Sequence, residues 1–409
     1  MSIANPWKTV HGPNATPPIQ AACNVSLNST SYGDFCDIQI SSQDFIMRIK
    51  THALSLVVGL VLISPVVAQP TFNFDITTFQ SGGFGLSENQ FLQAFQDGAD
   101  LWSERFTDDV TINVELQLIN GTFLAGTDTN FANHSYASVV AAMTADANSV
   151  SDFQAVSSLQ SGASYDLMIN RTSQNGNSAS SYLDNNGSFN NSNVQLTDAN
   201  AMALGLADPN LGGRDMLIIV GNDPGGLSGL ISWDTDRSDD IGILSIDLIG
   251  VAAHELAHGM GFISNVDLLD ENTGISEDGV TATIPDLFRF SNASAALGDG
   301  ILDMSVDTSD KYFSLDGGVT SLGQFSTGIN NGDGRQASHW KDDALSGTHL
   351  GLMDPTIDLG VITSISDLDI ALLDVAGWTL AVPEPSSALA LGWLCVGLSI
   401  RRRRRPTEV

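Results

Sequence analysis

Cysteine is nearly absent from this 409-residue sequence, and basic residues are scarce in its long middle part. All three cysteines lie outside residues 69–382, at Cys23, Cys36 and Cys395. A domain built from residues 69–382 therefore has no disulfides and no thiolate metal ligands. This stretch carries 42 of the 47 acidic residues but only 8 of the 16 basic ones, a net charge of −34. Such a charge repels nucleic acid and anionic lipid, so we expect neither as a partner.

The N-terminal region contains an apolar run preceded by basic residues. Arg48 and Lys50 follow Met47, the run extends from Ala53 to Val67, and Ala68 ends it before Gln69. This order predicts a secretory signal peptide over residues 47–68. Because such a signal begins near the start codon, residues 1–46 are interpreted as a misassigned upstream start or a disordered leader. The alternative is a cytoplasmic extension ahead of a membrane anchor.

The C-terminal region shows three features in order. Val382-Pro383-Glu384-Pro385 precedes the apolar residues 386–400, and Arg401–Arg405 follow, with 406–409 as a tail. The apolar stretch is short for a full bilayer span. Residues 383–405 resemble the PEP-CTERM sorting signal of Gram-negative bacteria. The resemblance implies export, transient inner-membrane anchoring, cutting by a membrane sorting transpeptidase, and release to the cell surface or exopolysaccharide matrix. An ordinary tail anchor is the alternative.

The first half of the middle part shows alternating helix and strand patterns. Helical spacing and a Ser87/Gln90 capping box predict a helix over 87–106, the first folded element. Strict alternation predicts a strand over 110–118, and a second helix is expected over about 136–147. Residues 172–193 are rich in Ser, Asn and Gly, which predicts an exposed loop. The apolar run 216–220 predicts a central strand buried on both faces.

The second half is built around one apolar helix. We expect it to begin near Ser245 or Asp247 and to end at Gly259 or Gly261, buried on all sides. A long Gly/Asp/Ser-rich insertion follows over 263–337, and a capped helix runs from Ser366 to Gly377. The sequence thus predicts one α+β domain over 69–382, with an upper part (69–262) and a lower part (263–382).

The apolar helix carries the most informative motif of the chain, His254-Glu255-x-x-His258. Imidazoles four residues apart on a helix project from one face at the spacing that holds a single Zn²⁺. Zinc lowers the pKa of a bound water toward about 7, and Glu255 is placed to move protons as the general acid/base. The alternative is a pair of ordinary buried histidines, which would be costly without partners.

A catalytic zinc site needs a third protein ligand. The position ten residues after His254 is Ser264, so a short ligand spacing fails. His339, followed by Trp340, is the preferred third ligand, and Met353 lies 14 residues beyond it, where a methionine turn can pack beneath a metal. The rival ligands are Asp267, Glu277 and His349. Met353 as ordinary core and His339 as a surface residue are the alternatives.

With these motifs, residues 248–354 resemble the leishmanolysin-like metzincin metallopeptidases. The resemblance implies a zincin fold, with His254, His258 and His339 as zinc ligands and Glu255 as acid/base. It also implies Gly261 as the helix-ending turn and Met353 as the Met-turn. The chain departs from the pattern in having no tyrosine two residues after the methionine, where Pro355 stands. It also lacks the cysteine of a cysteine-switch propeptide.

The sequence therefore predicts a secreted, monomeric zinc endopeptidase acting on protein or peptide substrates. The competing interpretations are a catalytically inactive zincin-fold surface or matrix protein and a zinc hydrolase of non-peptide amides. Asp-rich residues 234–240 could bind Ca²⁺, although their spacing does not match an EF-hand loop and a solvated acidic loop is the simpler interpretation.

Overall fold

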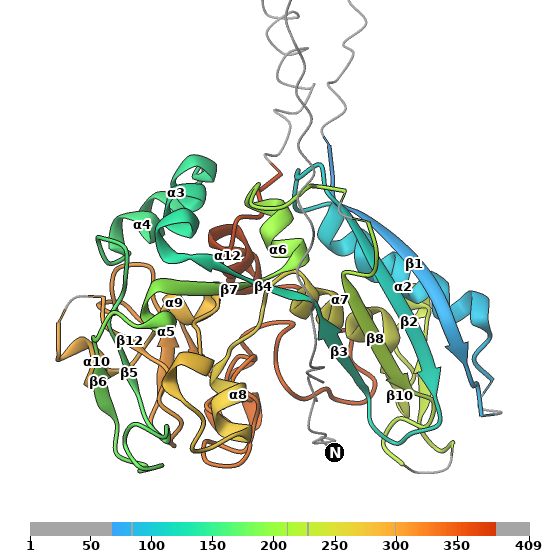
Figure 1. The fold of residues 1–409 in the computed structure, drawn as a ribbon. Coiled ribbons are helices and arrows are strands. Elements are labelled where there is room, and N and C mark those ends of the chain that lie inside the picture. The colour runs from blue at the N-terminus through green and yellow to red at the C-terminus, as the bar shows by residue number, and fades with distance from the viewer. Residues whose placement is uncertain (1–67, 83–84, 211, 227–228, 299, 382–409) are drawn as a thin grey trace, which may run out of the picture. The chain divides into compact units, whose positions relative to one another are not determined.

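The computed structural model describes residues 68–381, apart from 83–84, 211, 227–228 and 299. The predicted leader, all of the predicted signal peptide except Ala68, and the predicted sorting signal lie outside the described residues. Within the described part the chain is a mixed α+β protein, as its sequence predicts (Figure 1). No described helix is both long and apolar enough to cross a bilayer.

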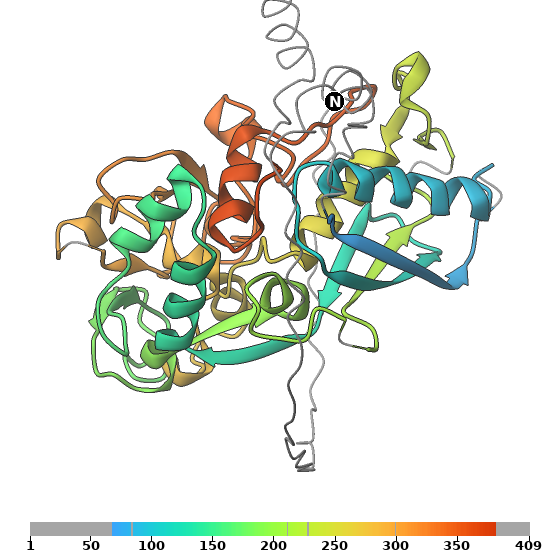
Figure 2. The ribbon, with the colours of Figure 1, turned by 90° about the horizontal axis from the view of Figure 1, so that it is seen from above.

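A four-stranded mixed sheet organises the first half. Its strand order is β1-β2-β8-β3, in which β1, β2 and β8 run parallel and β3 runs antiparallel to β8. The sheet and α2 lie on the same side of the molecule in both Figure 1 and Figure 2. The elements are β1 (Thr71–Phe79), α2 (Glu88–Ser103), β2 (Thr111–Ile119), β3 (Ala125–Thr129) and β8 (Met216–Gly221).

Local patterns predicted several of these elements and missed others. The Ser87/Gln90 capping box starts α2 as expected, and β2 buries alternate side chains. The first element is β1 rather than α2, because Phe72, Phe74 and Ile76 alternate with polar residues. Strand β8 is central, but Leu217 and Ile219 are only partly buried, so burial on both faces is wrong.

Another part of the structure lies beside the sheet (Figures 1 and 2). It includes the paired strands β4 and β7, and β4 follows strand β3 of the sheet directly in the chain. Its first elements are β4 (Phe131–Ser135), α3 (Tyr136–Asp146), α4 (Val150–Ser158), β5 (Leu167–Ile169), β6 (Tyr182–Asp184), α5 (Phe189–Ser192), β7 (Asn193–Thr197) and α6 (Asp198–Ala203). The exposed loop predicted over 172–193 is wrong in part. Strand β6 and helix α5 fall within it, and Asn190 and Asn191 are fully buried.

The remaining chain contains many short elements around one long buried helix. They are β9 (Ser232–Asp234), β10 (Ser245–Asp247), α7 (Leu248–Gly259), α8 (Val266–Glu271), α9 (Ile284–Leu287), β11 (Arg289–Phe290), α10 (Asn292–Ala295), β12 (Leu302–Asp303), β13 (Lys311–Phe313), β14 (Gly323–Phe325), α11 (Asp343–Ser346) and α12 (Asp367–Val375), with 3-10 turns at Arg237–Asp239 and Glu277–Gly279. The predicted insertion over 263–337 is therefore folded and largely buried. Its helices and strands are too short to show a periodic pattern of apolar residues in the sequence.

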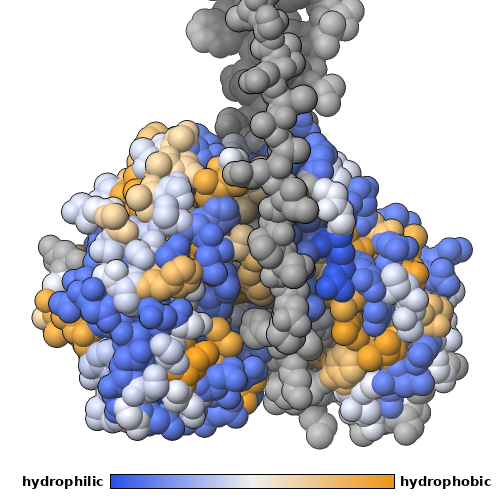
Figure 3. Space-filling view, viewed as in Figure 1, coloured by the Kyte–Doolittle hydropathy of each residue, from blue (hydrophilic) through white to orange (hydrophobic). Residues whose placement is uncertain are grey.

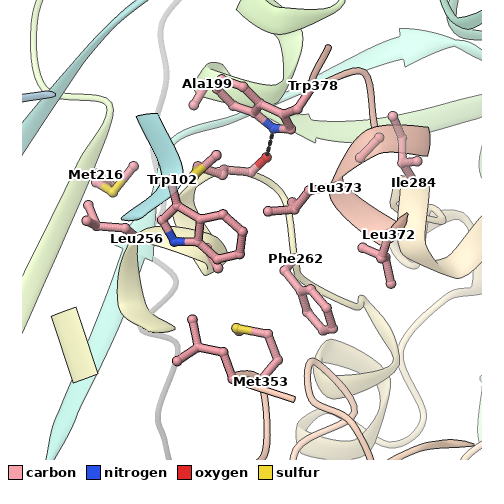
Figure 4. Close-up of a cluster of buried hydrophobic side chains, with 14 of the residues drawn as sticks. Trp102, Ala199, Met216, Leu256, Phe262, Ile284, Met353, Leu372, Leu373 and Trp378 are labelled. Carbon is pink, nitrogen blue, oxygen red and sulfur yellow. Dashed lines mark hydrogen bonds between the residues drawn. The ribbon is translucent and has the colours of Figure 1, made fainter. Parts of the chain in front are cut away.

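Helix α7 packs directly against α2 because a glycine lets their backbones approach. A Cβ atom added to Gly98 would lie 2.9 Å from Ala252 Cβ and 3.0 Å from Ile249 O. Close by, Trp102 Nε1 donates a hydrogen bond to Ala253 O over 2.9 Å. At the other end of α7, Trp378 Nε1 donates to Met260 O, which ties the chain after α12 to the same helix (Figure 4). Helix α7 is thus held from both sides.

Helices α3, α4 and α12 bring together three carboxyl groups, those of Asp146, Asp152 and Asp374. Asp374 is 1% exposed; its Oδ2 accepts a bond from Ser149 Oγ, and its Oδ1 has no hydrogen-bond partner among the described residues. Burial, with smaller repulsion from Asp152 and Asp146, raises the pKa of Asp374 to about 7.

This raised pKa makes stability depend on pH. A carboxyl group whose folded pKa lies above its unfolded value stabilises the fold fully below about pH 4, and that contribution is lost as pH rises through about 7. We therefore expect Asp374→Asn to be more stable than the wild type at pH 8, with the difference shrinking toward pH 5. Urea unfolding at both pH values measures it, and equal free energies of unfolding at pH 8 would contradict the assignment.

The visible face of the protein is mostly polar, with hydrophobic residues scattered in small groups (Figure 3). Polar coverage of this kind agrees with the strong negative charge of the middle part. The core lies beneath it, and its largest fully buried side chains include three tryptophans, Trp102, Trp340 and Trp378.

Candidate metal centre

Helix α7 presents its two histidines from a fixed N-terminus. Asp247 is the N-cap and accepts a bond from Gly250 N, as the sequence predicts. The same carboxylate pairs with Arg237 at 2.5 Å and accepts bonds from Thr363 N and Oγ1. The first turn of the helix is therefore tied to the preceding turn Arg237–Asp239 and to the distant loop at Thr363, which limits movement of the residues that follow it.

The helix ends at the predicted glycine turn. Gly261 has φ +117°, a backbone conformation that other residues rarely adopt, and a Cβ there would lie 3.1 Å from the Asn200 side chain. Phe262 N donates to Ala257 O across this turn. The turn also directs Phe262 O to His258, whose Nδ1 lies 2.7 Å from that oxygen.

The structure brings His339 to the pair of histidines on α7. The ring centroids lie 4.9 Å apart for His254 and His258, 5.1 Å for His254 and His339, and 4.9 Å for His258 and His339. All three side chains are at most 3% exposed. One ligand atom from each lies within 4.8 Å of the others, so the cluster can hold a metal ion.

Backbone carbonyls orient all three rings. The Nδ1 atoms of His254, His258 and His339 lie 2.8, 2.7 and 3.4 Å from Leu352 O, Phe262 O and Gln336 O. An Nδ1–H that donates to a carbonyl leaves the Nε2 lone pair available as a ligand, which is the usual arrangement of metal-bound histidine. The Nε2 atoms of His254 and His339 are 3.1 Å apart. Two nitrogen ligands of one tetrahedral zinc would be about 3.3 Å apart, given Zn–N bonds of about 2.0–2.1 Å.

Burial keeps these imidazoles neutral. It is the main cause that lowers the pKa of His254 and of His339 well below the usual value, with repulsion from the neighbouring histidines adding to it. Burial also lowers the pKa of His258 to about 4. Neutral imidazole is the form that binds metal, so the cluster is ready to accept a cation near neutral pH.

Glu255 lies on α7 between the two histidines and is fully buried. Thr127 Oγ1, from β3, donates to its Oε2 over 2.5 Å, while Oε1 has no hydrogen-bond partner among the described residues. Burial raises the pKa of Glu255 to about 8. An unsatisfied buried carboxyl oxygen beside three ligand-ready imidazoles fits a site that holds a water molecule and a cation, whose charge would lower the pKa of Glu255. No local pattern in the sequence predicts the contact with Thr127, because residues 127 and 255 are far apart in the chain.

Met353 is fully buried and belongs, with Phe262, to the hydrophobic cluster of Figure 4. Its turn is fixed by Asp369 of α12, which accepts bonds from Leu352 N, Met353 N and Trp340 Nε1. Asp369 also completes the capping box of α12 with Ser366. In the structure the same carboxylate joins the turn that orients His254 to the residue that follows His339.

The rival third ligands have other roles. Asp267 accepts bonds from Ala337 N (2.6 Å), Ser338 N (2.9 Å) and Ser338 Oγ (2.5 Å), so its carboxylate holds the loop that carries His339. Glu277 accepts bonds from Tyr182 Oη and Asn186 Nδ2. His349 lies with Asp343 and Asp354 in a separate cluster.

Asp267 should matter to metal binding through His339. We expect Asp267→Asn to weaken the affinity for an added divalent metal ion about 10–100-fold, as loss of groups that orient ligands typically does. The reason is that an amide cannot accept all three donors, so the loop loses its fixed position. Competition with a chromogenic chelator measures the affinity. Unchanged affinity in a folded variant would show that the loop holds its position without this carboxylate.

The Asp-rich residues 234–240 show no gathered ligand set. Asp234 accepts bonds from Asp236 N and Gly242 N, and Asp236 accepts one from Ser238 N. Among the described residues, the ligand groups close enough to share an ion are the three-histidine cluster and the Asp343/His349/Asp354 cluster. The carboxylates of Asp234 and Asp236 therefore stabilise the turns of their own loop.

Comparison of the chain with protein-family models, curated proteins and solved structures gives no match. The fold and the site together define a mixed α+β protein with a buried cluster of three histidines that can bind a metal ion.

Proposed function

We propose that this protein is a zinc-dependent endopeptidase of the metzincin type. The observation that carries the proposal is the convergence of three buried, neutral imidazoles on one point, with a buried carboxylate on the same helix. Three nitrogen ligands without thiolate, each oriented by a carbonyl, suit Zn²⁺ and leave a fourth position open. An open position distinguishes a catalytic zinc site from a structural one.

The chemistry divides between the metal and the chain. Zinc bound there would supply a hydroxide-like nucleophile at neutral pH and polarise the scissile carbonyl. Glu255 would take the proton released by the attacking water and deliver it to the leaving amine. Thr127 holds one oxygen of Glu255, which leaves Oε1 to move the proton. The carbonyls of residues 262, 336 and 352 keep each ring in the ligating tautomer.

We further propose that the enzyme is exported and sorted. The basic-apolar-small order at 47–68 and the Pro-Glu-Pro, apolar and arginine order at 383–405 support this route. The mature enzyme would act at the cell surface or in the exopolysaccharide matrix. A middle part without cysteine needs no oxidative folding on that route.

The test is metal-dependent proteolysis by the purified protein. We expect zinc bound at the histidine cluster and hydrolysis of casein that stops with a chelator and returns when Zn²⁺ is added back. Metal analysis and a fluorescent casein assay measure both. Zinc-loaded protein that leaves casein and a peptide library intact would contradict the peptidase and favour an inactive zincin-fold protein. Chelator-resistant cleavage would contradict the zinc mechanism.

A further inference from the structure

A second group of ligand-type side chains lies outside the histidine cluster. Asp343 begins helix α11, His349 lies on the loop after it, and Asp354 follows Met353. One ligand atom from each of these three residues lies within 4.8 Å of the others. Two carboxylates and one imidazole from the single stretch of residues 343–354 thus lie close to a common point.

The side chains of this group lie at ion-pair distances that are longer than hydrogen bonds and close to those between ligands of one ion. His349 Nδ1 lies 3.8 Å from Asp343 Oδ2 and 3.7 Å from Asp354 Oδ2, beyond the range of a direct hydrogen bond. Ligands bound at about 2.0–2.2 Å to a tetrahedral ion would be separated by roughly 3.3–3.6 Å. A shift of a few tenths of an ångström in the exposed His349 and Asp343 side chains would close the site.

The buried member of the group is held in place. Asp354 is 3% exposed, and its Oδ2, which faces His349, also accepts a bond from Asp343 N. Its Oδ1 accepts bonds from Thr356 N and Oγ1. One ligand is therefore fixed by the fold, while the side chains of His349 and Asp343 are 48% and 38% exposed and within reach of ions from solvent.

Among the described residues, the carboxylates near Asp343 outnumber the cationic groups that interact with it. Burial, with repulsion from Asp354, Asp342 and Asp358, raises the pKa of Asp343 above its usual value. The nearby cation Arg335 is paired at 2.5 Å with Asp342. Several carboxylates thus share one imidazole, whose pKa Asp354 raises above the usual value, and this concentration of negative charge favours binding of a divalent cation.

We propose that Asp343, His349 and Asp354 form a second divalent-metal site, distinct from the histidine cluster and independent of the proposed peptidase activity. One imidazole and two carboxylates, completed by water, suit zinc and similar borderline ions. Calcium prefers a larger shell of oxygen ligands, so it fits this set less well. A bound ion would link helix α11 to the Met353 turn, whose neighbour Leu352 orients His254.

Zinc titration of the full chain, stripped of metal, tests the proposal. We expect His349→Gln and Asp343→Asn each to bind one equivalent fewer than the wild type. Both residues are substantially exposed, so both variants should fold. His134→Gln, which alters a histidine outside both clusters, should bind as many equivalents as the wild type. A millimolar excess of Ca²⁺ should leave the second equivalent bound.

The outcomes separate this site from the catalytic one. If His349→Gln and Asp343→Asn bind as much zinc as the wild type, or if Ca²⁺ displaces the equivalent they control, the second site is wrong. His339→Gln tests the histidine cluster by itself. The wild type could also show no peptidase activity while His349→Gln still binds one zinc fewer. That result would support the second site and contradict the proposed function.

Discussion

Glu255→Gln is expected to abolish casein hydrolysis while leaving one zinc bound at the histidine cluster. The substituted side chain keeps the shape of glutamate and can still accept the bond from Thr127, so the fold and the ligands should be retained. It cannot take up the proton of the attacking water. General acid/base groups contribute about 10²–10⁴-fold to turnover. We therefore expect kcat/KM to fall by at least about 10²-fold at unchanged zinc content.

Glu277→Gln is the matched control. Glu277 is also buried, at 5% exposure, but it bonds to Tyr182 and Asn186 away from the histidines. The same substitution there should leave hydrolysis close to the wild-type rate. Casein cleavage by Glu255→Gln at a rate similar to wild type would remove Glu255 from the mechanism. A loss of activity accompanied by a loss of zinc would instead assign Glu255 to metal binding.

His339→Gln is expected to cause the largest loss of metal affinity. The variant removes one of three neutral nitrogen ligands, and loss of a direct ligand should exceed the 10–100-fold cost of losing a group that only orients one. Zinc binding to the folded wild type raises its melting temperature by mass action. We expect most of this rise to disappear in His339→Gln, together with casein hydrolysis.

Melting curves with and without zinc, combined with chelator competition, measure both quantities. His134→Gln serves as the control, because His134 lies on β4 and belongs to neither the three-histidine cluster nor the Asp343/His349/Asp354 cluster. It should retain the wild-type zinc affinity and activity. If His339→Gln binds zinc at the histidine cluster as tightly as the wild type, another residue completes the coordination, and the proposed catalytic arrangement must be revised.

Several features were readable from the sequence because they depend on neighbours along the chain. The capping boxes at Ser87 and Ser366, the alternation in β2 and the pair His254/His258 arise from interactions over three or four residues. Strand β1 carried a similar alternation and could have been predicted. The small elements within 263–337 could not, because two to six residues are too few to establish a period.

The sequence by itself determined the helix that carries His254, Glu255 and His258, and it ranked His339 above Asp267, Glu277 and His349 as their partner. Only the tertiary structure decided that His339 reaches them, because that approach depends on contacts between residues far apart in the chain. Asp267 holds the loop of His339, Asp369 holds the Met353 turn, and Thr127 holds Glu255. Contacts between residues so far apart in the chain produce no periodic pattern in the sequence, so the sequence does not predict them.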